Sequence, residues 1–236
     1  MVEQYIYPGS ELALFAKAIN WKKYFSSQIK PYIKQNVLEV GAGIGSTTTL
    51  LNDGTVSKWL LLEPDEIMAR KLREKIDRHE FPPNCEVLIG TLEQLSQDNK
   101  FDTIIYIDVL EHIDDDRKEI KNASEHLNEN GHLIILSPAF SFLFSPFDKA
   151  IGHYRRYTMR DLKKIVPTAL EVVKLKYLDT IGFFASFANR LFLRQSYPTA
   201  KQIAIWDKML IPVSKITDKI FLHSFGKTVL AIWRKR

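Results

Sequence analysis

Short, nearly continuous apolar runs recur along the first 140 residues, and each run ends at a glycine, a proline or a polar residue. Near-continuous hydrophobicity is typical of strands that are covered on both faces, as in the parallel sheets of α/β proteins. We therefore predict five buried strands in this part of the chain. They span residues 37–40, 59–62, 86–89, 103–107 and 132–136.

The segments between these runs have the pattern of helices. Residues 65–80 are rich in Lys, Arg, Glu and Leu and are followed by Pro82 and Pro83, which stop a helix. Residues 116–128 have the same character, and residues 11–29 carry apolar side chains at the spacing of an amphipathic helix. Alternating strands and helices predict parallel strands joined by crossover helices.

Two more strand candidates, residues 171–178 and 228–233, flank a 46-residue apolar and aromatic segment, 180–225. A structureless loop of that length is unusual inside a compact domain. Aromatic residues spaced by four, such as Phe183 and Phe187, indicate helices instead. We therefore predict one domain, 1–236, made of an N-terminal helical segment (1–35), a core sheet (36–178), a helical cap insertion (179–225) and a last strand (226–236).

Composition fits a globular protein: of 236 residues, 45% are hydrophobic and 26% charged. The single cysteine, Cys85, excludes an intramolecular disulfide and a Cys-based zinc site, and we expect no metal site. The first ten residues lack the apolar core of a secretory signal, and no apolar stretch reaches the length of a membrane span. We expect a cytoplasmic protein.

Charge is distributed unevenly along the chain. The net charge is +5, but residues 153–236 hold 17 Lys and Arg against five Asp and Glu, whereas residues 1–152 hold 16 basic and 23 acidic residues. A basic C-terminal third is typical of proteins with an anionic partner, such as nucleic acid, phospholipid headgroups or an anionic substrate. A solvated lysine-rich surface has the same pattern.

A glycine-rich loop, Glu39-Val-Gly41-Ala-Gly43-Ile-Gly45, follows the first predicted strand. Glycines at alternate positions allow a sharp turn and the close approach of a ligand. The dinucleotide-binding pattern G-x-G-x-x-G is not matched, because Ser46 stands at the place of its third glycine. The carboxylate of Glu39 favours a ligand that carries positive charge. A tight turn without a ligand would use the same glycines.

Acidic residues also follow the second and fourth predicted strands. Glu63 stands where the acidic residue of nucleotide-binding βαβ units accepts both ribose hydroxyls, although a helix N-terminus also favours an acid there. Asp108 begins the motif Asp108-Val-Leu-Glu111-His112. Ligands in open α/β sheets bind at this edge, outside the carboxyl ends of the strands.

The glycine loop, Glu63 and the Asp-Val-Leu-Glu-His motif together resemble the class I S-adenosylmethionine-dependent methyltransferases, in particular their small-molecule group. The resemblance runs from about residue 36 to residue 137. It implies an α/β fold with a Rossmann-like seven-stranded mixed sheet flanked by helices, whose last strand is antiparallel. The family usually joins its last two strands by a short hairpin, so the helical insertion at 180–225 departs from that pattern.

The resemblance also implies S-adenosyl-L-methionine as the cofactor. The glycine loop would surround its methionine half, Glu63 would hold the ribose hydroxyls, and Asp108 would lie near the amino group and the transferring methyl. The adenine would lie beside Thr91 and Leu92, where many family members have an acidic residue. The implied cofactor-binding residues are Glu39, Gly41, Ala42, Gly43, Gly45, Glu63, Pro64, Thr91, Leu92, Asp108 and Val109.

The loop after the fifth predicted strand, residues 137–157, mixes aromatic side chains with histidine, arginine and aspartate. Methyl transfer needs in-line alignment and, for a hydroxyl or ammonium acceptor, a base. His112, Asp148 and His153 are the candidate catalytic bases, because each falls on a loop at the cofactor side of the sheet. The alternative for His112 is that it caps the following helix.

The insertion is where we expect the acceptor to be selected. A helical cap above the strand ends would enclose the acceptor and exclude water, with Tyr154, Phe183, Phe187 and Trp206 lining the substrate pocket. The same apolar surface with its interspersed basic residues would also suit a peripheral membrane contact or a dimer. The oligomeric state stays open.

We therefore expect an S-adenosylmethionine-dependent methyltransferase that acts on an O, N or C atom of a small or amphiphilic molecule. The basic C-terminal third raises an RNA methyltransferase as an alternative, but the chain has no Asn-Pro-Pro-Tyr-type motif and no appended RNA-binding module. Nucleic acid is thus not the expected partner. A noncatalytic S-adenosylmethionine-binding interaction subunit is the second alternative, against which the complete glycine loop argues.

Overall fold

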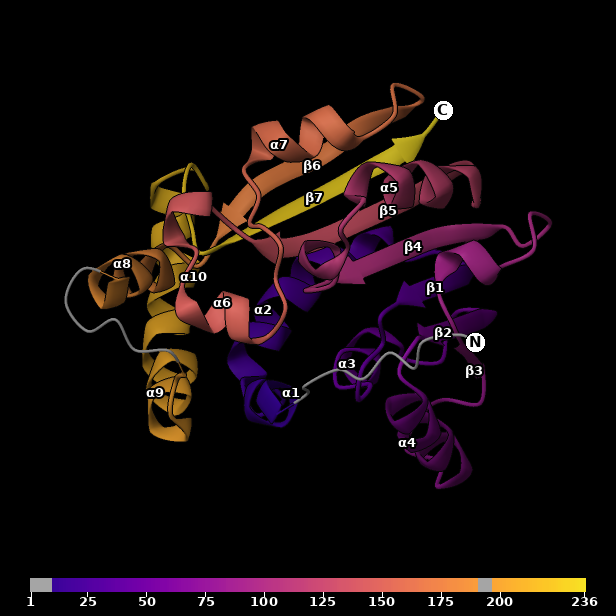
Figure 1. The fold of residues 1–236 in the computed structure, drawn as a ribbon, viewed down its shortest axis with the longest axis horizontal. Coiled ribbons are helices and arrows are strands. Elements are labelled where there is room, and N and C mark those ends of the chain that lie inside the picture. Colours follow the sequence, from indigo (N-terminus) through magenta and orange to yellow (C-terminus); the bar gives the residue numbers. More distant parts are fainter. Residues whose placement is uncertain (1–9, 191–196) are drawn as a thin grey trace.

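The computed structural model describes residues 10–190 and 197–236, and seven strands form a single sheet in it (Figure 1). The strands are β1 (Asn36–Val40), β2 (Lys58–Glu63), β3 (Cys85–Ile89), β4 (Phe101–Ile107), β5 (Leu127–Pro138), β6 (Leu170–Leu178) and β7 (Thr228–Lys235). Their order is β3-β2-β1-β4-β5-β7-β6, and only β7 runs antiparallel to its neighbours. The predicted Rossmann-like mixed sheet is confirmed.

Each of the seven predicted strands is present within a few residues of its expected place, except at the start of β5. That strand begins at Leu127, whereas the sequence indicated residue 132. Leu127 pairs with Phe101 before the register shifts, and Asn130 then turns the chain with a φ of +62°. The helix predicted over 116–128 therefore ends at Glu125.

Helices cover both faces of the sheet, and each face has its own core cluster. On one face, α5 and α7 pack against the strands through side chains such as Ile120 and Leu162. On the other, α2, α3 and α4 contribute Phe25, Leu51 and Leu72. These helices span Ile19–Ile29 (α2), Thr48–Leu51 (α3), Glu66–Asp77 (α4), Asp116–Glu125 (α5) and Met159–Ile165 (α7).

The N-terminal helix predicted over 11–29 is broken into α1 (Ser10–Phe15) and α2. Asp207, from the insertion, accepts hydrogen bonds from the backbone N–H groups of Asn20 (3.2 Å) and Trp21 (2.8 Å) in the first turn of α2. Such groups lack partners within a helix, so a distant carboxylate satisfies this end. Residues 1–9 of the predicted segment lie outside the described residues.

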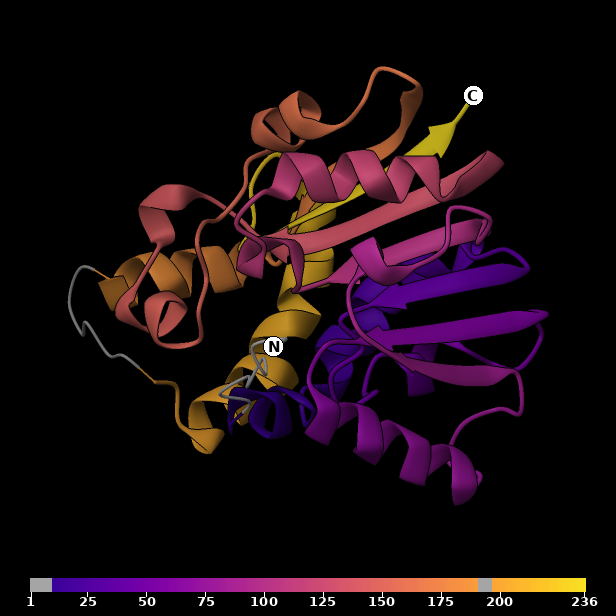
Figure 2. The same ribbon diagram turned by 45° about the vertical axis from the view of Figure 1, so that its right-hand side comes forward.

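The insertion between β6 and β7 is helical and lies beyond the carboxyl ends of the parallel strands (Figures 1 and 2). Besides Asp207, it is held by Asp218, which accepts hydrogen bonds from the Tyr24 hydroxyl and from the backbone N–H of Thr180, each at 2.8 Å. Residues 191–196 of the insertion are outside the described part. Its elements are α8 (Thr180–Ala188), α9 (Ala200–Ile205), a π-helical turn (Trp206–Leu210) and α10 (Ile211–Ile220).

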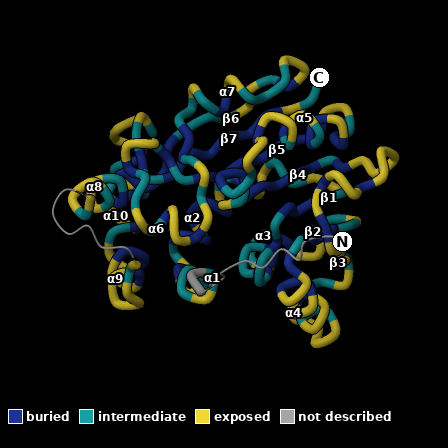
Figure 3. The backbone as a smooth tube through the Cα atoms, in the orientation of Figure 1, coloured by how far each residue is buried: buried dark blue, intermediate teal, exposed yellow. Residues whose placement is uncertain are grey.

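Burial follows this arrangement: the central strands β1, β2, β4 and β7 are mostly buried, the edge strands β3 and β6 are partly exposed, and the outer turns of α4, α9 and α10 are exposed (Figure 3). None of the helices in the described residues combines the length and the apolar character needed to cross a membrane. The remaining short elements lie around the edge of the sheet. They are α6 (Pro146–Ala150) and the 3₁₀ turns Lys30–Tyr32, Leu92–Gln94, Leu110–His112 and Ser141–Leu143.

Candidate functional site

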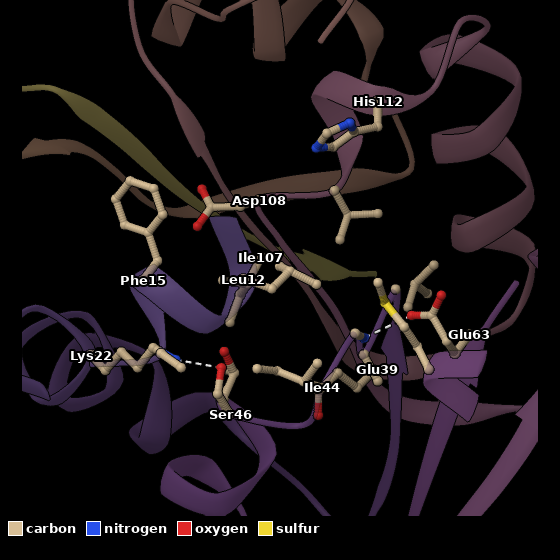
Figure 4. Close-up of a pocket in the computed structure, with 18 of the residues that line it drawn as sticks. Leu12, Phe15, Lys22, Glu39, Ile44, Ser46, Glu63, Ile107, Asp108 and His112 are labelled. Carbon is tan, nitrogen blue, oxygen red and sulfur yellow. Dashed lines mark hydrogen bonds between the residues drawn. The ribbon is translucent and has the colours of Figure 1, made fainter. Parts of the chain in front are cut away.

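Two cavities meet at the carboxyl edge of the sheet. The first, of about 200 Å³, lies between the glycine loop, the ends of β2 and β4, and the N-terminal helices (Figure 4). The second, of about 480 Å³, lies between the loop after β5 and the insertion. The two cavities share five lining residues, so they adjoin there. These are Leu12, Phe15, Trp21, Asp108 and His112.

The glycine loop presents bare backbone to the first cavity. Gly41 has a φ of +65°, and a Cβ atom placed on it would lie 2.7 Å from Cγ2 of Val109. Gly43 has a φ of +57°, but a Cβ there would meet only Leu12, at 3.5 Å. Both dihedral angles favour glycine. The loop therefore turns tightly against the end of β4, and Gly41 has less room for a side chain than Gly43.

The carboxylate of Glu63 is fixed at the end of β2. Its Oε2 accepts a hydrogen bond from the Gly43 N–H at 2.7 Å, and its Oε1 accepts one from the Asp65 N–H at 3.0 Å. Burial raises the pKa of Glu63, and these two backbone bonds partly offset the effect. Each oxygen keeps further lone-pair sites. Glu63 can thus accept hydroxyl groups of a ligand in an orientation set beforehand.

Glu39 also lines the first cavity, but its Oε2 is occupied by the protein. This atom accepts hydrogen bonds from the Thr48 hydroxyl (2.9 Å) and from Nε1 of Trp59 (2.8 Å). Burial raises the pKa of Glu39 to about 7, which exceeds the effect of those two donors. Through these bonds its carboxyl group supports the glycine loop. The polar contacts to a ligand must come from other residues.

Asp108 lines both cavities, and Figure 4 shows it in the first one between Phe15 and His112. Its φ of +53° is uncommon for a residue other than glycine, and such backbone strain concentrates at functional sites. Burial raises the pKa of Asp108, and the positive charges of Lys227 and Lys22 offset part of this. The chain therefore holds a carboxyl group in a strained position that faces a possible ligand.

Lys22, on α2, is a cavity residue that the sequence analysis did not identify. It is buried, it lies against Ser46 in a hydrogen bond (Figure 4), and burial lowers its pKa to about 8. A lysine on an amphipathic helix is usually assigned to the solvated face, so the pattern carried no signal for it. Together with Glu63 and Asp108 it gives the cavity charges of both signs.

Three predicted cofactor residues do not line the cavity. Thr91 is exposed and its N–H donates to Oε1 of Gln94 in a capping box, while Leu92 is buried in the core. The chain after β3 thus closes on itself, contrary to the expectation. Gly45 packs on the other side of the loop, where a Cβ would collide with the ring of Phe81. The other predicted positions, including Ala42, Pro64 and Val109, do line it.

The second cavity has a polar end formed by the loop after β5. Asp148, fully buried, accepts hydrogen bonds from Nδ1 of His153 (2.9 Å), from Nε and Nη2 of Arg156 (2.8 and 2.9 Å) and from Ser145. Burial alone would raise the pKa of Asp148, but the bonds from His153 and Arg156 hold it well below its usual range. This saturated carboxylate positions His153. Asp148 itself therefore does not fit its predicted role as a catalytic base.

His153 and His112 are brought together, as the prediction of a shared site requires. Their ring centroids are 4.5 Å apart at 80°, and Nε2 of His153 lies 3.9 Å from Oε1 of Glu111. Burial, and then the charge of His153, lowers the pKa of His112 to about 4, so its ring is neutral. A neutral ring at the junction can accept a proton or a cation.

Of the predicted substrate residues, only Trp206 lines the second cavity. Tyr154 is exposed beside Arg155, outside the cavity. Phe183 and Phe187 lie on the face of α8 that packs against Phe142, whereas the opposite face, with Ala185 and Ser186, faces the cavity. The expectation that these three aromatic side chains line the pocket is not met. The spacing predicted the helix, but it did not show which face turns inward.

Comparison with known proteins identifies the domain. A family model described as a methyltransferase domain matches residues 12–174. No curated protein matches the sequence. Many solved structures share the fold.

Three of these solved structures span methyl-transfer and other chemistry. An S-adenosylmethionine-dependent methyltransferase from Clostridium acetobutylicum is 12% identical, with a TM-score of 0.59 over 93% of this chain and 92% of that one. The N-methyltransferase NodS from Bradyrhizobium japonicum is 16% identical (0.57, 95% and 98%). SpnF, a cyclase, is 13% identical (0.63, 96% and 95%). At these identities the likeness shows the fold alone.

Proposed function

Because this chain belongs to the methyltransferase domain family, we propose that it transfers the methyl group of S-adenosylmethionine to an O, N or C atom of a small, largely apolar or amphiphilic molecule. One observation carries the proposal: the glycine-loop cavity and the larger, mainly apolar cavity adjoin at Asp108 and His112. A donor in the first cavity would thus face an acceptor in the second.

The charges of the first cavity fit S-adenosylmethionine. Glu63, held by two backbone N–H groups, would accept the ribose hydroxyls. Asp108 would pair with the amino group, and Lys22 would pair with the carboxylate of the methionine half. The backbone at Gly43, where a Cβ would meet only Leu12 at 3.5 Å, leaves room for the chain of the methionine. Met68, which also lines this cavity, offers a polarizable apolar surface for adenine.

The residues of the second cavity would align and activate the acceptor. When bound, the cofactor supplies an electrophilic methyl carbon on a sulfonium. Trp206 and Ile203 provide apolar walls, which hold an apolar body and exclude water. Asp148 orients His153 at the polar end, where a hydroxyl or amine would lie within reach of an imidazole nitrogen. In-line approach to the methyl would then follow from the position of the two cavities.

Binding of the cofactor is tested by calorimetry with S-adenosylmethionine and its demethylated product. Glu63→Ala removes the partner of two hydroxyls, each bond to a charged group being worth about 1.5–3 kcal/mol, so affinity should fall at least tenfold. Glu86→Ala is the matched control, because Glu86 is an exposed acid on the neighbouring strand β3 that pairs with Lys58. Equal cofactor affinity in both variants would contradict the assignment of Glu63 to the ribose hydroxyls.

Turnover is tested by incubating the protein with methyl-labelled cofactor and fractionated lysate metabolites. Label in an organic-extractable small molecule, lost in His153→Ala, would support the proposal. Label in RNA that diminishes with rising salt would favour a nucleic-acid acceptor instead. Tight cofactor binding with no labelled product would favour the noncatalytic interaction subunit.

A further inference from the structure

Three potential metal ligands converge at the polar end of the second cavity. Glu111, His112 and His153 each offer one ligand atom, and these atoms all lie within 4.8 Å of one another. The three side chains come from two separate loops and line the same cavity. An ion equidistant from three atoms that are 4.8 Å apart lies about 2.8 Å from each, so at that limit the ligands would move inward by about 0.7 Å to reach metal–nitrogen distances of about 2.0–2.1 Å.

Glu111 supplies an independent sign that something is bound here. Its side chain is fully buried, and its Oε1 has no hydrogen-bond partner among the residues that the structure describes. An unpaired buried carboxylate oxygen is costly, and proteins normally satisfy it. Nε2 of His153 lies 3.9 Å from this oxygen, beyond hydrogen-bonding distance. A cation between these two atoms would satisfy both.

The groups around the cluster hold the ligands in a coordinating orientation. Nδ1 of His153 is taken up by its 2.9 Å hydrogen bond with Asp148, so Nε2 is the ring nitrogen that faces Glu111. The Ser137 hydroxyl donates to Oε2 of Glu111 at 3.0 Å, which leaves Oε1 for the ion. A carboxylate behind a histidine and a donor behind a carboxylate are typical of metal ligands.

We propose that Glu111, His112 and His153 bind one divalent transition-metal ion, such as Zn²⁺ or Mn²⁺, at the junction of the two cavities. Two imidazoles and one carboxylate suit these ions, whereas Mg²⁺ prefers oxygen ligands and retains its water. Three protein ligands leave open positions, as in catalytic metal sites. This site departs from the expectation of no metal, because the histidines are 41 residues apart in the sequence and only the fold joins them.

The role of the ion rests on the proposed function. A hydroxyl of the acceptor that coordinates the ion would lose its proton to solvent more readily. Its oxygen would then form a bond to the methyl carbon as the carbon–sulfur bond breaks, with that electron pair staying on sulfur. The open positions favour an acceptor in which a second oxygen neighbours the reacting hydroxyl, because such a pair chelates the ion.

Ion binding is measured by calorimetry on the full chain after chelator treatment, with ZnCl₂ and MnCl₂ as probes and no cofactor. One ion per chain is expected, with affinity at least tenfold weaker in Glu111→Gln, His112→Gln and His153→Gln. His79→Asn is the matched control: it removes an exposed histidine that follows α4, and asparagine tolerates its φ of +57°. The control should bind as the native protein does.

Cobalt provides a readout without mutation. Co²⁺ bound by nitrogen and oxygen should give visible absorption bands that one equivalent of Zn²⁺ removes. No bound ion in the native protein, or equal binding in all four variants, would overturn the proposal. Cofactor affinity measured with and without chelator keeps this outcome separate from the proposed function, since Glu63 and Lys22 do not belong to the cluster. Loss of metal binding with cofactor binding retained would leave the methyltransferase proposal standing.

A second observation concerns the outer surface of the insertion. Its three acidic residues in the described part, Asp179, Asp207 and Asp218, are all buried. The exposed apolar side chains there include Ile216 (62%) and Ile220 (67%). Its described basic residues are at the surface or part-buried, and they are Arg190, Lys201, Lys208, Lys215 and Lys219.

We infer that this basic and apolar face rests on an anionic phospholipid surface. Exposed apolar side chains among cations, without surface acids, complement a negatively charged membrane. Ile205 is half exposed and also lines the second cavity, so an amphiphilic acceptor could pass from the surface into the site. A second protein chain is the competing occupant.

Flotation with phosphatidylglycerol vesicles should recover the native protein, and neutral phosphatidylcholine vesicles should not. The double variant Ile216→Ser and Ile220→Ser should reduce binding at least fivefold. Ile67→Ser is the control, because Ile67 is also exposed (52%) and lies on α4, outside the insertion. Equal flotation of all variants, or a dimer in sedimentation that only the double variant dissociates, would overturn the membrane assignment.

Discussion

The two adjoining cavities are built from different parts of the protein. The first uses loops that directly follow β1, β2 and β4, and its critical contacts are made by backbone, such as the N–H of Gly43 on Glu63. The second uses side chains from the β5 exit loop and the insertion, which meet only after folding, such as Asp148 with Arg156. A local backbone conformation is specified by a few neighbouring residues, whereas a side-chain network depends on the whole chain.

This difference predicts opposite sensitivities. Substitutions in the glycine loop should abolish ligand binding and leave the rest of the fold intact. Substitutions in the second cavity should affect stability and acceptor choice and leave cofactor affinity unchanged.

The largest effect is expected at Gly41. In Gly41→Val the Cβ would lie 2.7 Å from Val109, at a φ of +65° that costs a residue with a Cβ about 1–2 kcal/mol. Cofactor binding should be lost in calorimetry, at least a hundredfold. Gly43→Val is the comparison variant: it shares the strain of a positive φ, +57°, but its Cβ would meet Leu12 at an ordinary 3.5 Å, so it should lose less affinity. A greater loss of cofactor affinity in the Gly43 variant than in Gly41→Val would contradict the conclusion that Gly41 makes the tighter contact.

The glycine pattern shows how far the sequence reaches. Alternating glycines at the end of a buried strand predicted the loop, and the positions of Glu63 and Asp108 at strand ends placed both acids beside the same cavity, because all of these are local features. Nothing local separates Gly41, whose Cβ position is closed by Val109 from the turn after β4, from Gly45, whose Cβ position is closed by Phe81. Lys22 also enters the cavity only through packing of α2.

The acceptor side was harder to predict for the same reason. Asp148 and His153 were both predicted as candidate bases. Which of them keeps a free acceptor depends on Arg156 and Ser145, whose hydrogen bonds saturate the Asp148 carboxylate. The aromatic spacing in α8 predicted a helix but left its rotation undetermined, since apolar residues occur on both of its faces. A helix that covers the sheet has one apolar face, which packs against the sheet. A helix of the cap has apolar side chains on both its inner and its outer face.

Asp148→Asn should strongly destabilise the second region. Arg156 would keep its charge in a buried place without an anionic partner, which costs about 3–5 kcal/mol. Its neighbour Arg155 provides the control: its partner Asp114 is exposed, so Asp114→Asn should cost about 0–1 kcal/mol. Urea unfolding measures both, and similar losses in the two variants would contradict the buried network.

Stability should also depend on pH through Glu39. Burial raises its pKa from 4.5 to about 7 in the folded state, so folding favours the protonated carboxyl. The ionised form therefore lowers the free energy of unfolding progressively from about pH 4.5 and fully above pH 7. Glu39→Gln, which keeps an acceptor for Thr48 and Trp59, should match the native protein at pH 4.5 and exceed it at pH 8 by on the order of 3 kcal/mol. A constant difference across this range would contradict the raised pKa.

The smallest effects distinguish the two faces of α8. Ala185 lines the second cavity, so Ala185→Phe should reduce the space for the acceptor and raise its KM about tenfold. Phe187 packs against Phe142 on the opposite face, so Phe187→Ala should change the KM less than twofold. Neither substitution should alter cofactor affinity, because neither residue lines the first cavity. The rates are measured with the acceptor identified by labelling, and a larger effect of Phe187→Ala would mean that the outer aromatic face, as the sequence first indicated, selects the acceptor.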